Sequence, residues 1–394
     1  MPALLPVAEA QARLLALASP LSIEQVPLRA AAGRWAAAPI TAHRTQPELP
    51  LSAMDGYAIR HADLPGPWTV IGESAAGRPF AGVIAPGQAT RIFTGAALPP
   101  GADCVLVQEE ARREGERLHL EGEGPGYPGR NVRPAGLDFH EGDTLIEAGQ
   151  RLTPAGLALA AVAGHATLPV RRRVRVAIAA TGDELRAPGE PLAAGELPES
   201  NGTMLAAQFA DLPVEVVDLG ILPDRLDTLT AAFAAVHDDI LVTTGGASVG
   251  DHDLVSPALE AAGATIDFWK IALRPGKPMM AGRLRDTIVV GLPGNPVSAF
   301  VTALLFVKPL IAHLSGAGDP FPRTARATLA EPLPANGERT DYIRAARRPD
   351  GVVAAAIQDS SMLRTLARAD CLVVREPHAP AAAIGDSVEI LEIA

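Results

Sequence analysis

The stretch DILVTTGGASVGDHD, residues 239–253, decides the fold. An apolar run of strand length, residues 240–243, leads into glycines, and the acids Asp251 and Asp253 precede a helical pattern from Leu254. Glycines let backbone N–H groups approach an oxyanion, and a helix N-terminus adds partial positive charge. Carboxylates beside an anion would repel it unless a divalent cation lay between them. The stretch predicts a phosphate and Mg²⁺ site or, as the plainer alternative, an ordinary strand–turn–helix joint with an Asp cap.

Composition limits the class of protein. The chain has 394 residues, of which 48% are hydrophobic and 20% charged, as in a soluble globular protein of two to four domains. A net charge of −11 argues against nonspecific binding to nucleic acid. Cys104 and Cys371 form no metal-binding spacing, which favours a reduced compartment. No signal peptide is apparent, and the longest apolar run, residues 300–307, is too short to cross a bilayer. We expect a cytoplasmic protein without membrane contact.

The region from residue 171 to 317 alternates between predicted strands and helices. This pattern predicts an α/β domain with a doubly wound, mostly parallel sheet, in which ligands bind outside the carboxyl ends of the strands. The predicted strands are 174–180, 214–219, 240–243, 278–281 and 287–290, and the predicted helices are 201–211, 224–236, 253–262 and 296–314.

Three further units surround this domain in the sequence. Residues 43–137 contain short β segments separated by Gly and Pro, which predicts an inserted β-rich domain. Helical patterns at 7–18 and 153–164, with a possible helix at 30–38, predict one discontinuous helical or mixed N-terminal domain from residues 1–42 and 138–170. Residues 318–394 return to short strands and predict a small C-terminal β-barrel.

Charged residues gather near the predicted strand ends. The loop 269–278 carries Lys270, Arg274 and Lys277, which in an acidic protein indicates an oxyanion pocket, although three surface charges are the plainer alternative. The acids that follow strand ends favour a metal–phosphate site, although each alone could cap a helix: Asp183, Glu184, Asp224, Asp251 and Asp253. Ser248 and Ser298 have no nearby His, so we expect positioning and an activated water rather than covalent catalysis.

An ordered set of motifs resembles the MoeA family of molybdopterin molybdenumtransferases, whose eukaryotic counterpart is the E domain of gephyrin. One motif alone would be weak, but the set extends over most of the chain. The motifs are 52–58 (SAMDGYA), 92–96 (IFTGA), 101–103 (GAD), 131–133 (NVR), 181–185 (TGDEL), 200–201 (SN), 245–250 (GGASVG), 275–278 (PGKP) and 291–298 (GLPGNPVS).

The resemblance implies an activity and an architecture. Family members complete molybdenum cofactor assembly: they hydrolyse adenylylated molybdopterin with Mg²⁺ and insert molybdate at the dithiolene, which releases AMP. It also implies an elongated four-domain subunit that forms a homodimer, with its active cleft between the α/β domain of one subunit and parts of the other. Contacts with the adenylylating enzyme and with acceptor molybdoenzymes follow from this role.

The resemblance also implies site residues, position by position. The catalytic set is Asp55, Glu184, Asp224 and Asp253, of which Asp224 and Asp253 would bind the metal. The substrate-binding set is Thr94, Arg133, Asp138, Gly245, Gly246, Ser248, Lys270, Pro293 and Pro296, and the molybdate set is Arg274, Lys277, Ser298, Arg344 and Ser360. The chain departs from the family pattern in having Arg274 where Lys is common, Leu137 where Glu is frequent, and the acid Asp359 where many relatives have Gly.

Two other functions remain open at this point. The same α/β domain occurs in proteins that only hold molybdopterin or act as scaffolds, and in pyrophosphatases that act on other adenylylated ligands. The acids around Asp55 and Glu184 favour catalysis over a scaffold, and the additional domains argue against the pyrophosphatase. Release of AMP from adenylylated molybdopterin, and its dependence on molybdate, would separate the three.

Overall fold

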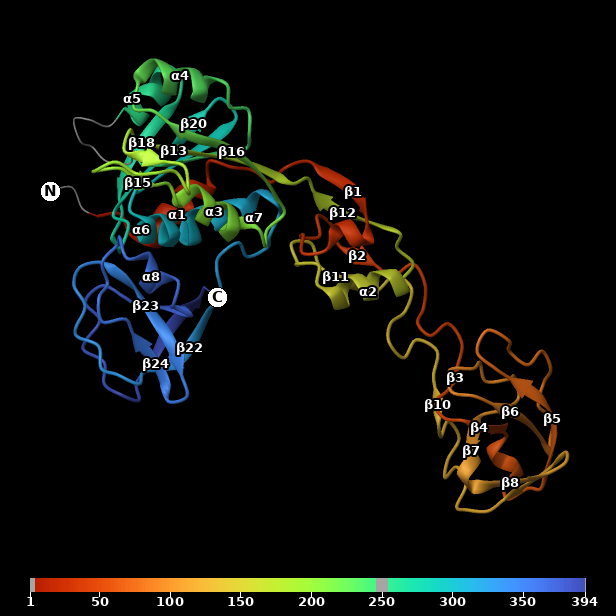
Figure 1. Ribbon diagram of the computed structural model, residues 1–394. Helices are drawn as coiled ribbons and strands as arrows, with labels where there is room; N and C mark the ends of the chain where they lie inside the picture. The colour runs from red at the N-terminus through yellow and green to blue at the C-terminus, as the bar shows by residue number, and fades with distance from the viewer. Residues whose placement is uncertain (1–3, 246–253, 394) are drawn as a thin grey trace.

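The computed structural model describes residues 4–245 and 254–393. Figure 1 shows an elongated chain: the central α/β domain and the C-terminal domain lie together at one end, and a separate β sheet lies at the other. Two extended segments of the chain connect these ends through a small intermediate unit. The multidomain α/β architecture is therefore as predicted.

The central domain is built on one mixed six-stranded sheet. Its strands include all five that the sequence predicts. Four of these are parallel, the fifth, Pro278–Leu284, is antiparallel to its neighbours, and the sixth strand, Thr265–Lys270, was not predicted. The strand order is β16 (Val214–Leu222), β13 (Val174–Thr181), β17 (Ile240–Thr244), β21 (Thr287–Leu292), β20 (Pro278–Leu284) and β18 (Thr265–Lys270).

Helices cover both faces of this sheet because its strands are apolar on both sides. On β13, Val176 and Ile178 face one apolar core, and the alternating Ala177 and Ala179 face another. The second core holds α4 (Leu226–Ala234) and α5 (Val255–Ala261), and the first holds α1 (Val7–Leu15), α3 (Asn201–Phe209), α6 (Pro296–Thr302) and α7 (Lys308–Leu314). Helix α1 thus packs with the central domain in space, whereas the sequence assigned it to the N-terminal unit.

The predicted helix over 296–314 is continuous, because the π-helical turn Ala303–Val307 joins α6 to α7. By length and composition the segment is long and apolar enough to cross a membrane. The expectation that its apolar run was too short was wrong, because the helix continues through Lys308 and Pro309. However, 83% of its apolar window is buried inside the protein. It is a core helix of the central domain.

The intermediate unit is assembled from two distant segments of the chain. Strand β1 (Ile23–Pro27) pairs with β12 (Thr167–Arg171), and β2 (Ile40–Thr41) pairs with β11 (Thr144–Ile146). Helix α2 (Pro154–Val162) begins as predicted, with the Thr153 hydroxyl accepting a hydrogen bond from the Gly156 N–H at 3.1 Å. The possible helix over 30–38 is wrong: only a short 3₁₀ turn, Leu28–Ala31, forms before the chain becomes extended.

The two remaining units are β structures. The inserted unit is a six-stranded sheet in the order β7 (Cys104–Val107), β4 (Gly56–Ile59), β6 (Gln88–Ile92), β5 (Trp68–Ser74), β9 (Arg117–Leu120) and β8 (Ala111–Glu114), and β3 (Leu51–Ser52) pairs with β10 (Val132–Arg133) where the chain enters it.

The C-terminal unit forms a circuit of strands. It runs through β22 (Thr324–Thr328), β26 (Ser387–Glu392), β25 (Cys371–Arg375), β23 (Thr340–Arg348) and β24 (Gly351–Ala354). A bridge between Leu329 and Val352 links the last strand back to the end of the first. The short strand β19 (Leu273–Arg274) comes from the central domain and pairs with β23, so the two domains share a sheet.

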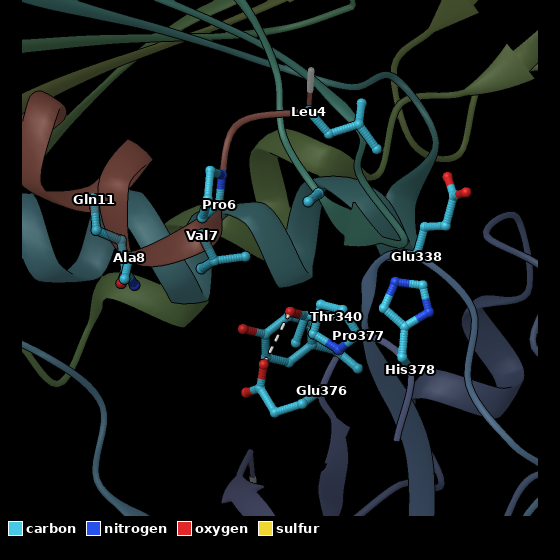
Figure 2. Close-up of a pocket in the computed structure, with 12 residues that line it drawn as sticks. Leu4, Pro6, Val7, Ala8, Gln11, Glu338, Thr340, Glu376, Pro377 and His378 are labelled. Carbon is cyan, nitrogen blue, oxygen red and sulfur yellow. Dashed lines mark hydrogen bonds between the residues drawn. The ribbon is translucent and has the colours of Figure 1, made fainter. Parts of the chain in front are cut away.

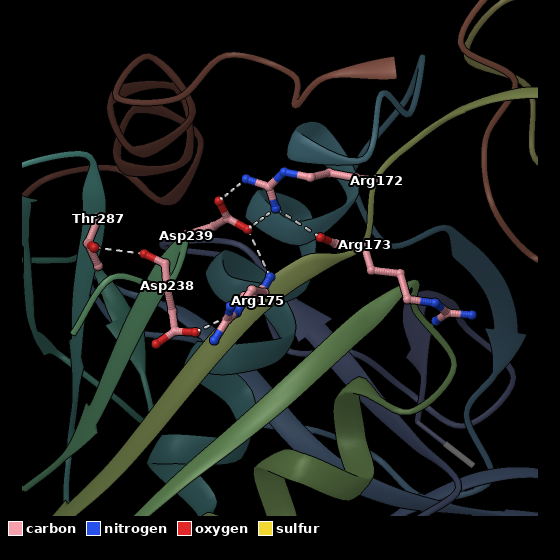
Figure 3. Close-up of polar contacts among 6 residues, drawn as sticks. All are labelled: Arg172, Arg173, Arg175, Asp238, Asp239 and Thr287. Carbon is pink, nitrogen blue, oxygen red and sulfur yellow. Dashed lines mark hydrogen bonds and ion pairs between the residues drawn. The ribbon is translucent and has the colours of Figure 1, made fainter. Parts of the chain in front are cut away.

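The basic triplet 171–173 serves the junction between the intermediate unit and the central sheet. Arg172 donates to both carboxylate oxygens of Asp239, at 2.7 and 2.6 Å, and Arg175 binds the neighbouring Asp238 at 2.9 Å. Figure 3 shows this cluster, with Arg173 pointing away from it. These residues lie at the start of β13 and before β17, opposite the carboxyl ends of the strands. Arg172 therefore has a structural role at this junction, where it ties the segment before β13 to the residue before β17.

Candidate functional site

The carboxyl ends of the four parallel strands lie along one edge of the central sheet, together with the start of β20 and the end of β18. The parallel register aligns Thr181 with Leu222, and the next pairs continue across the sheet to Thr244 and Leu292. On the antiparallel side Met280 lies opposite Gly291, which brings the start of β20 to this edge. The end of β18 joins it because Lys270 lies opposite Pro278. Most of the charged residues singled out in the sequence therefore share one edge, which we call the carboxyl edge.

The middle of the carboxyl edge is close-packed backbone. Gly245 has φ +91°, and a Cβ there would lie 2.8 Å from the Thr181 carbonyl oxygen, so the turn after β17 requires glycine. Gly294 approaches Gly245 closely, and its carbonyl accepts from the Asn201 side chain at 2.8 Å. Asn201 is the first residue of α3, and its side chain fastens this turn to that helix. The turns that follow β13, β17 and β21 thus lie close together at the middle of the carboxyl edge.

A cluster of acids lies at the β13–β16 side of the carboxyl edge. The Asp224 N–H donates to the Asp183 carboxylate at 3.1 Å, which holds these two turns together. Burial raises the pKa of Asp224, and the charges of Asp183 and Glu184 raise it further. Arg225, not Asp224, is the N-cap of α4, so capping does not account for this acid. These neighbours make the ionised form of Asp224 less favourable than that of a free carboxyl group.

The predicted metal set is only partly within the described residues. Asp224 lies on the carboxyl edge, but Asp253, Gly246 and Ser248 lie outside the parts of the chain that the structure describes. Among residues 4–245 and 254–393, no group of three or more His, Cys, Asp or Glu side chains has a geometry that could hold a metal alone. A metal bound here would therefore depend on donors beyond these side chains.

The predicted cations lie on the opposite side of the same edge. Lys270 ends β18, and the loop with Arg274 and Lys277 packs directly on α6. The contact requires Gly276, because a Cβ there would lie 2.5 Å from the Thr302 hydroxyl. Pro293 belongs to the turn after β21, and Pro296 is the first residue of α6. The loop, this turn and the start of α6 form the cationic side of the carboxyl edge.

The five predicted molybdate residues fall into two groups around the start of α6. Ser298 is buried in α6, and the neighbouring Val297 N–H donates to the Ser360 carbonyl at 3.0 Å. Arg344 is also buried and donates to Gln358, at 3.2 Å, in the same loop as Ser360. Burial lowers the pKa of Arg344, and the charge of Asp359 opposes this effect.

Arg274 belongs to the other group, with Lys277. Its guanidinium forms an ion pair with Asp341, a buried carboxylate at the start of β23. Asp341 and Arg344 are three residues apart on one strand, so their side chains leave opposite faces of β23. Arg274 and Lys277 line a cavity of about 360 Å³ between the central and C-terminal domains, and Arg344, Ser298 and Ser360 do not. In the sequence Asp341 is one acid at the start of a strand, and nothing there indicates that it pairs with Arg274.

A larger neighbouring cavity, of about 630 Å³, has the wrong charge for an anion. Its wall includes the carboxylates of Glu338 and Glu376 and contains no Lys or Arg. Figure 2 shows Glu376 beside Thr340, with His378 on the same side of the cavity. Of these two cavities, the smaller one has the lining charges that suit an anion.

A second cluster of predicted residues lies far away, where the chain enters the inserted sheet. Asp55 accepts hydrogen bonds from the Thr94 N–H at 2.7 Å and the Thr94 hydroxyl at 2.8 Å, which lower the pKa of Asp55. Arg133 lies on β10, opposite Leu51 on β3, at the same end of the sheet. Asp138 lies farther along, where its N–H donates to the Gln46 carbonyl. Within one chain this cluster, which we call the arm cluster, does not meet the carboxyl edge (Figure 1).

Family models match three consecutive parts of the chain. Residues 5–164 match the MoeA N-terminal region (domain I and II), residues 177–313 match a probable molybdopterin binding domain, and residues 326–393 match the MoeA C-terminal region (domain IV).

Similar proteins and structures agree with these matches. A molybdopterin molybdenumtransferase of Haemophilus influenzae is 40% identical over 75% of this chain and 74% of its own, and one of Bacillus subtilis is 33% identical over 99% and 94%. The crystal structure of a molybdopterin biosynthesis MoeA protein from Pyrococcus horikoshii aligns with a TM-score of 0.85 at 27% identity, over 99% of this chain and 100% of its own. The chain belongs to the MoeA family of molybdopterin molybdenumtransferases, enzymes of molybdenum cofactor biosynthesis.

Proposed function

We propose that the chain hydrolyses adenylylated molybdopterin and inserts molybdate into the dithiolene, with release of AMP. One observation carries this proposal: a single sheet edge has carboxylates on one side, cations on the other and backbone turns between them. A ligand with a pyrophosphate bond needs cations to hold its oxyanions and a way to lower its charge during hydrolysis. A protein that only held molybdopterin would not need the carboxylates.

Mg²⁺ fits the acidic side of the carboxyl edge by the chemistry of its donors. Mg²⁺ takes one or two carboxylates, and water and phosphate oxygens complete its octahedron. The Asp224 carboxylate has a raised pKa because of burial and the charges of Asp183 and Glu184, which a divalent cation would offset. Asp224 and Asp253 would hold the ion, which would neutralise phosphate charge and activate a water.

The residues of the chain position the reacting groups. Lys270 at the end of β18 would bind a phosphate oxyanion, and the turns at Gly245 and Pro293 would approach the ligand through backbone. Glu184, exposed after β13, would accept a proton from the attacking water. The water oxygen forms a bond to phosphorus while the bond from phosphorus to the bridging oxygen breaks, which separates AMP from the phosphate of molybdopterin.

Molybdate is a substrate in this proposal and would bind at the cationic side. In this proposal Lys277 supplies charge on the loop, Arg274 supplies guanidinium donors, Ser298 supplies a hydroxyl, and Arg344 and Ser360 supply the adjoining part of the C-terminal domain. A tetrahedral dianion suits a forked guanidinium, a point charge and a hydroxyl. Arg344 and Asp341, the partner of Arg274, leave opposite faces of β23, so only part of this set reaches one bound anion.

We further propose that the working enzyme is a homodimer. The arm cluster, with Asp55, Thr94 and Arg133, lies at the far end of the chain from the carboxyl edge (Figure 1). A partner subunit placed antiparallel would bring its arm cluster to the carboxyl edge of the first, and a two-fold axis would then form two equal sites.

The remaining assignments belong to the same proposal. The domain boundaries would be 1–42 with 138–170, 43–137, 171–317 and 318–394, although α1 packs on the central domain. The enzyme would act in the cytoplasm, receive its substrate from the adenylylating enzyme and deliver the cofactor to molybdoenzymes.

The test is incubation with adenylylated molybdopterin, Mg²⁺ and molybdate, with AMP release and cofactor formation measured separately. The proposal expects AMP release that requires Mg²⁺ and cofactor formation that requires molybdate. If no AMP is released, the chain is a binding module; if AMP release proceeds without any cofactor formation, it is a pyrophosphatase.

A further inference from the structure

The cavity of about 360 Å³ between the central and C-terminal domains contains a cation that the family motifs do not include. Three basic residues line it: Arg274, Lys277 and Arg339. The carboxylates of Glu338 and Asp341 line it as well, so the cations outnumber the acids by one. Which cations are free to bind an anion therefore depends on how these charges are paired.

Arg274 is already neutralised within the protein. Its partner Asp341 is only 3% exposed, and the pairing of β19 with β23 places the two residues directly opposite each other. A buried carboxylate holds its cation strongly because releasing it would leave an unpaired buried charge. Arg274 is thus fixed in position but contributes little net charge to the cavity.

Lys277 and Arg339 carry the available charge. In the described parts of the chain, neither side chain has a hydrogen-bond or ion-pair partner. Glu338, which also lines the neighbouring acidic cavity in Figure 2, forms no ion pair with a described residue.

The backbone around Arg339 is fixed on both sides. Its carbonyl accepts from the Asn336 side chain at 2.8 Å, and the following Thr340 N–H donates to the Ala272 carbonyl at 2.9 Å. Ala272 precedes the loop that carries Lys277, so Arg339 is anchored to the same loop. The fixed backbone determines where the Arg339 side chain begins, and its planar guanidinium offers a forked donor to an oxyanion.

We propose that Arg339 is an anion-binding residue of this pocket and acts with Lys277 on the tetrahedral oxyanion, which the proposed function identifies as molybdate. Arg274, held by Asp341, supplies oriented donors and Arg339 supplies the unpaired charge. The proposal rests on the proposed function for the identity of the anion, and on the cavity and its pairing for the residue.

The experiment compares Arg339→Ala with Arg323→Ala, which removes one exposed charge from the start of the same domain. Molybdate binding is measured by calorimetry, and the half-saturating molybdate concentration is measured in cofactor formation. Loss of one charge-assisted contact should weaken molybdate binding about tenfold in Arg339→Ala and leave Arg323→Ala unchanged. Arg339→Lys should recover part of the affinity, because it restores the charge without the forked donor.

Three results separate the outcomes. Unchanged molybdate affinity in Arg339→Ala, with a normal unfolding transition, would overturn the role of Arg339 alone. Equal weakening in Arg323→Ala would show a general charge effect and would also overturn it. A wild-type enzyme that neither binds molybdate nor requires it would instead overturn the proposed function. Should Arg339→Ala unfold, Arg339→Gln replaces it in the same comparison.

Discussion

The aspartates of the arm cluster and of the carboxyl edge are held in opposite ways. Asp55 accepts two hydrogen bonds from Thr94, and its pKa is lowered. Asp224 is partly buried beside Asp183 and Glu184, and its pKa is raised. The protein thus stabilises the Asp55 carboxylate by itself, whereas no cation among the described residues is paired with the Asp224 carboxylate. This difference supports the proposal that a divalent cation binds at the carboxyl edge and not at the arm cluster.

The largest expected effect follows from removing the charge of Asp224. In Asp224→Asn, AMP release should fall roughly 100-fold and the Mg²⁺ requirement should rise, because a carboxylate donor is lost. The metal-free variant should be at least as stable as the wild type, since the repulsion from Asp183 and Glu184 is relieved. AMP release against Mg²⁺ concentration and thermal unfolding in EDTA check both parts. Full activity at wild-type Mg²⁺ would remove Asp224 from the metal site.

A third carboxylate, Asp341, sharpens the comparison because it forms an ion pair with a cation of the protein itself, Arg274. Arg274→Ala would leave this buried acid unpaired. We expect the free energy of unfolding to fall by about 1–3 kcal/mol, which is below the cost for a fully buried pair because the Arg274 side chain is 59% exposed. Urea unfolding measures this, with Arg323→Ala as the control. Equal stability of the two variants would show that the pair contributes nothing.

A smaller effect is expected where Asp55 is held. Thr94→Val removes the hydroxyl donor but keeps the N–H donor, so the pKa of Asp55 should rise partway toward its ordinary value. AMP release should fall roughly threefold to tenfold, and the half-saturating Mg²⁺ concentration should not change. A shifted Mg²⁺ requirement in Thr94→Val would erase the distinction between the two clusters.

The smallest effect is in the pH dependence of stability. Asp224 in the folded protein binds its proton more tightly than in the unfolded chain, so its contribution to stability falls as pH rises from the ordinary value of 3.8 through its raised pKa. Asp55 has the opposite sign: its contribution is present above 3.8 and is lost as pH falls through its lowered pKa. The wild type should therefore lose stability relative to Asp224→Asn across the Asp224 window in EDTA, and Mg²⁺ should remove this loss. Thermal unfolding against pH would contradict this if the two curves stayed parallel.

The sequence predicted those parts of the molecule that depend on local pattern. Apolar runs gave the parallel strands, Thr153 and Pro154 gave the start of α2, and the ordered motifs gave the family, which the comparisons confirm. It failed where pairing partners decide the outcome. Strand β18 exists because β20 pairs with it, and the place of the Asn201 side chain depends on its hydrogen bond to the Gly294 carbonyl.

The ion pairs and hydrogen bonds of the site could not be predicted from the sequence either. The pair between Arg274 and Asp341 spans two domains, and Asp224 has no capping role although its type and position suited one. The roles of the individual site residues stay predictions, because neither the fold nor the relatives test them.

The measurement that tests the account most directly is subunit complementation. Asp55→Asn and Asp224→Asn are each purified, mixed, allowed to exchange subunits and assayed for AMP release. If the arm cluster of one subunit completes the carboxyl edge of its partner, mixed dimers contain one intact site, and activity should recover to about a quarter of the wild type. If mixed dimers form and activity stays at the level of the separate variants, the two clusters do not meet across the dimer, and the account is wrong.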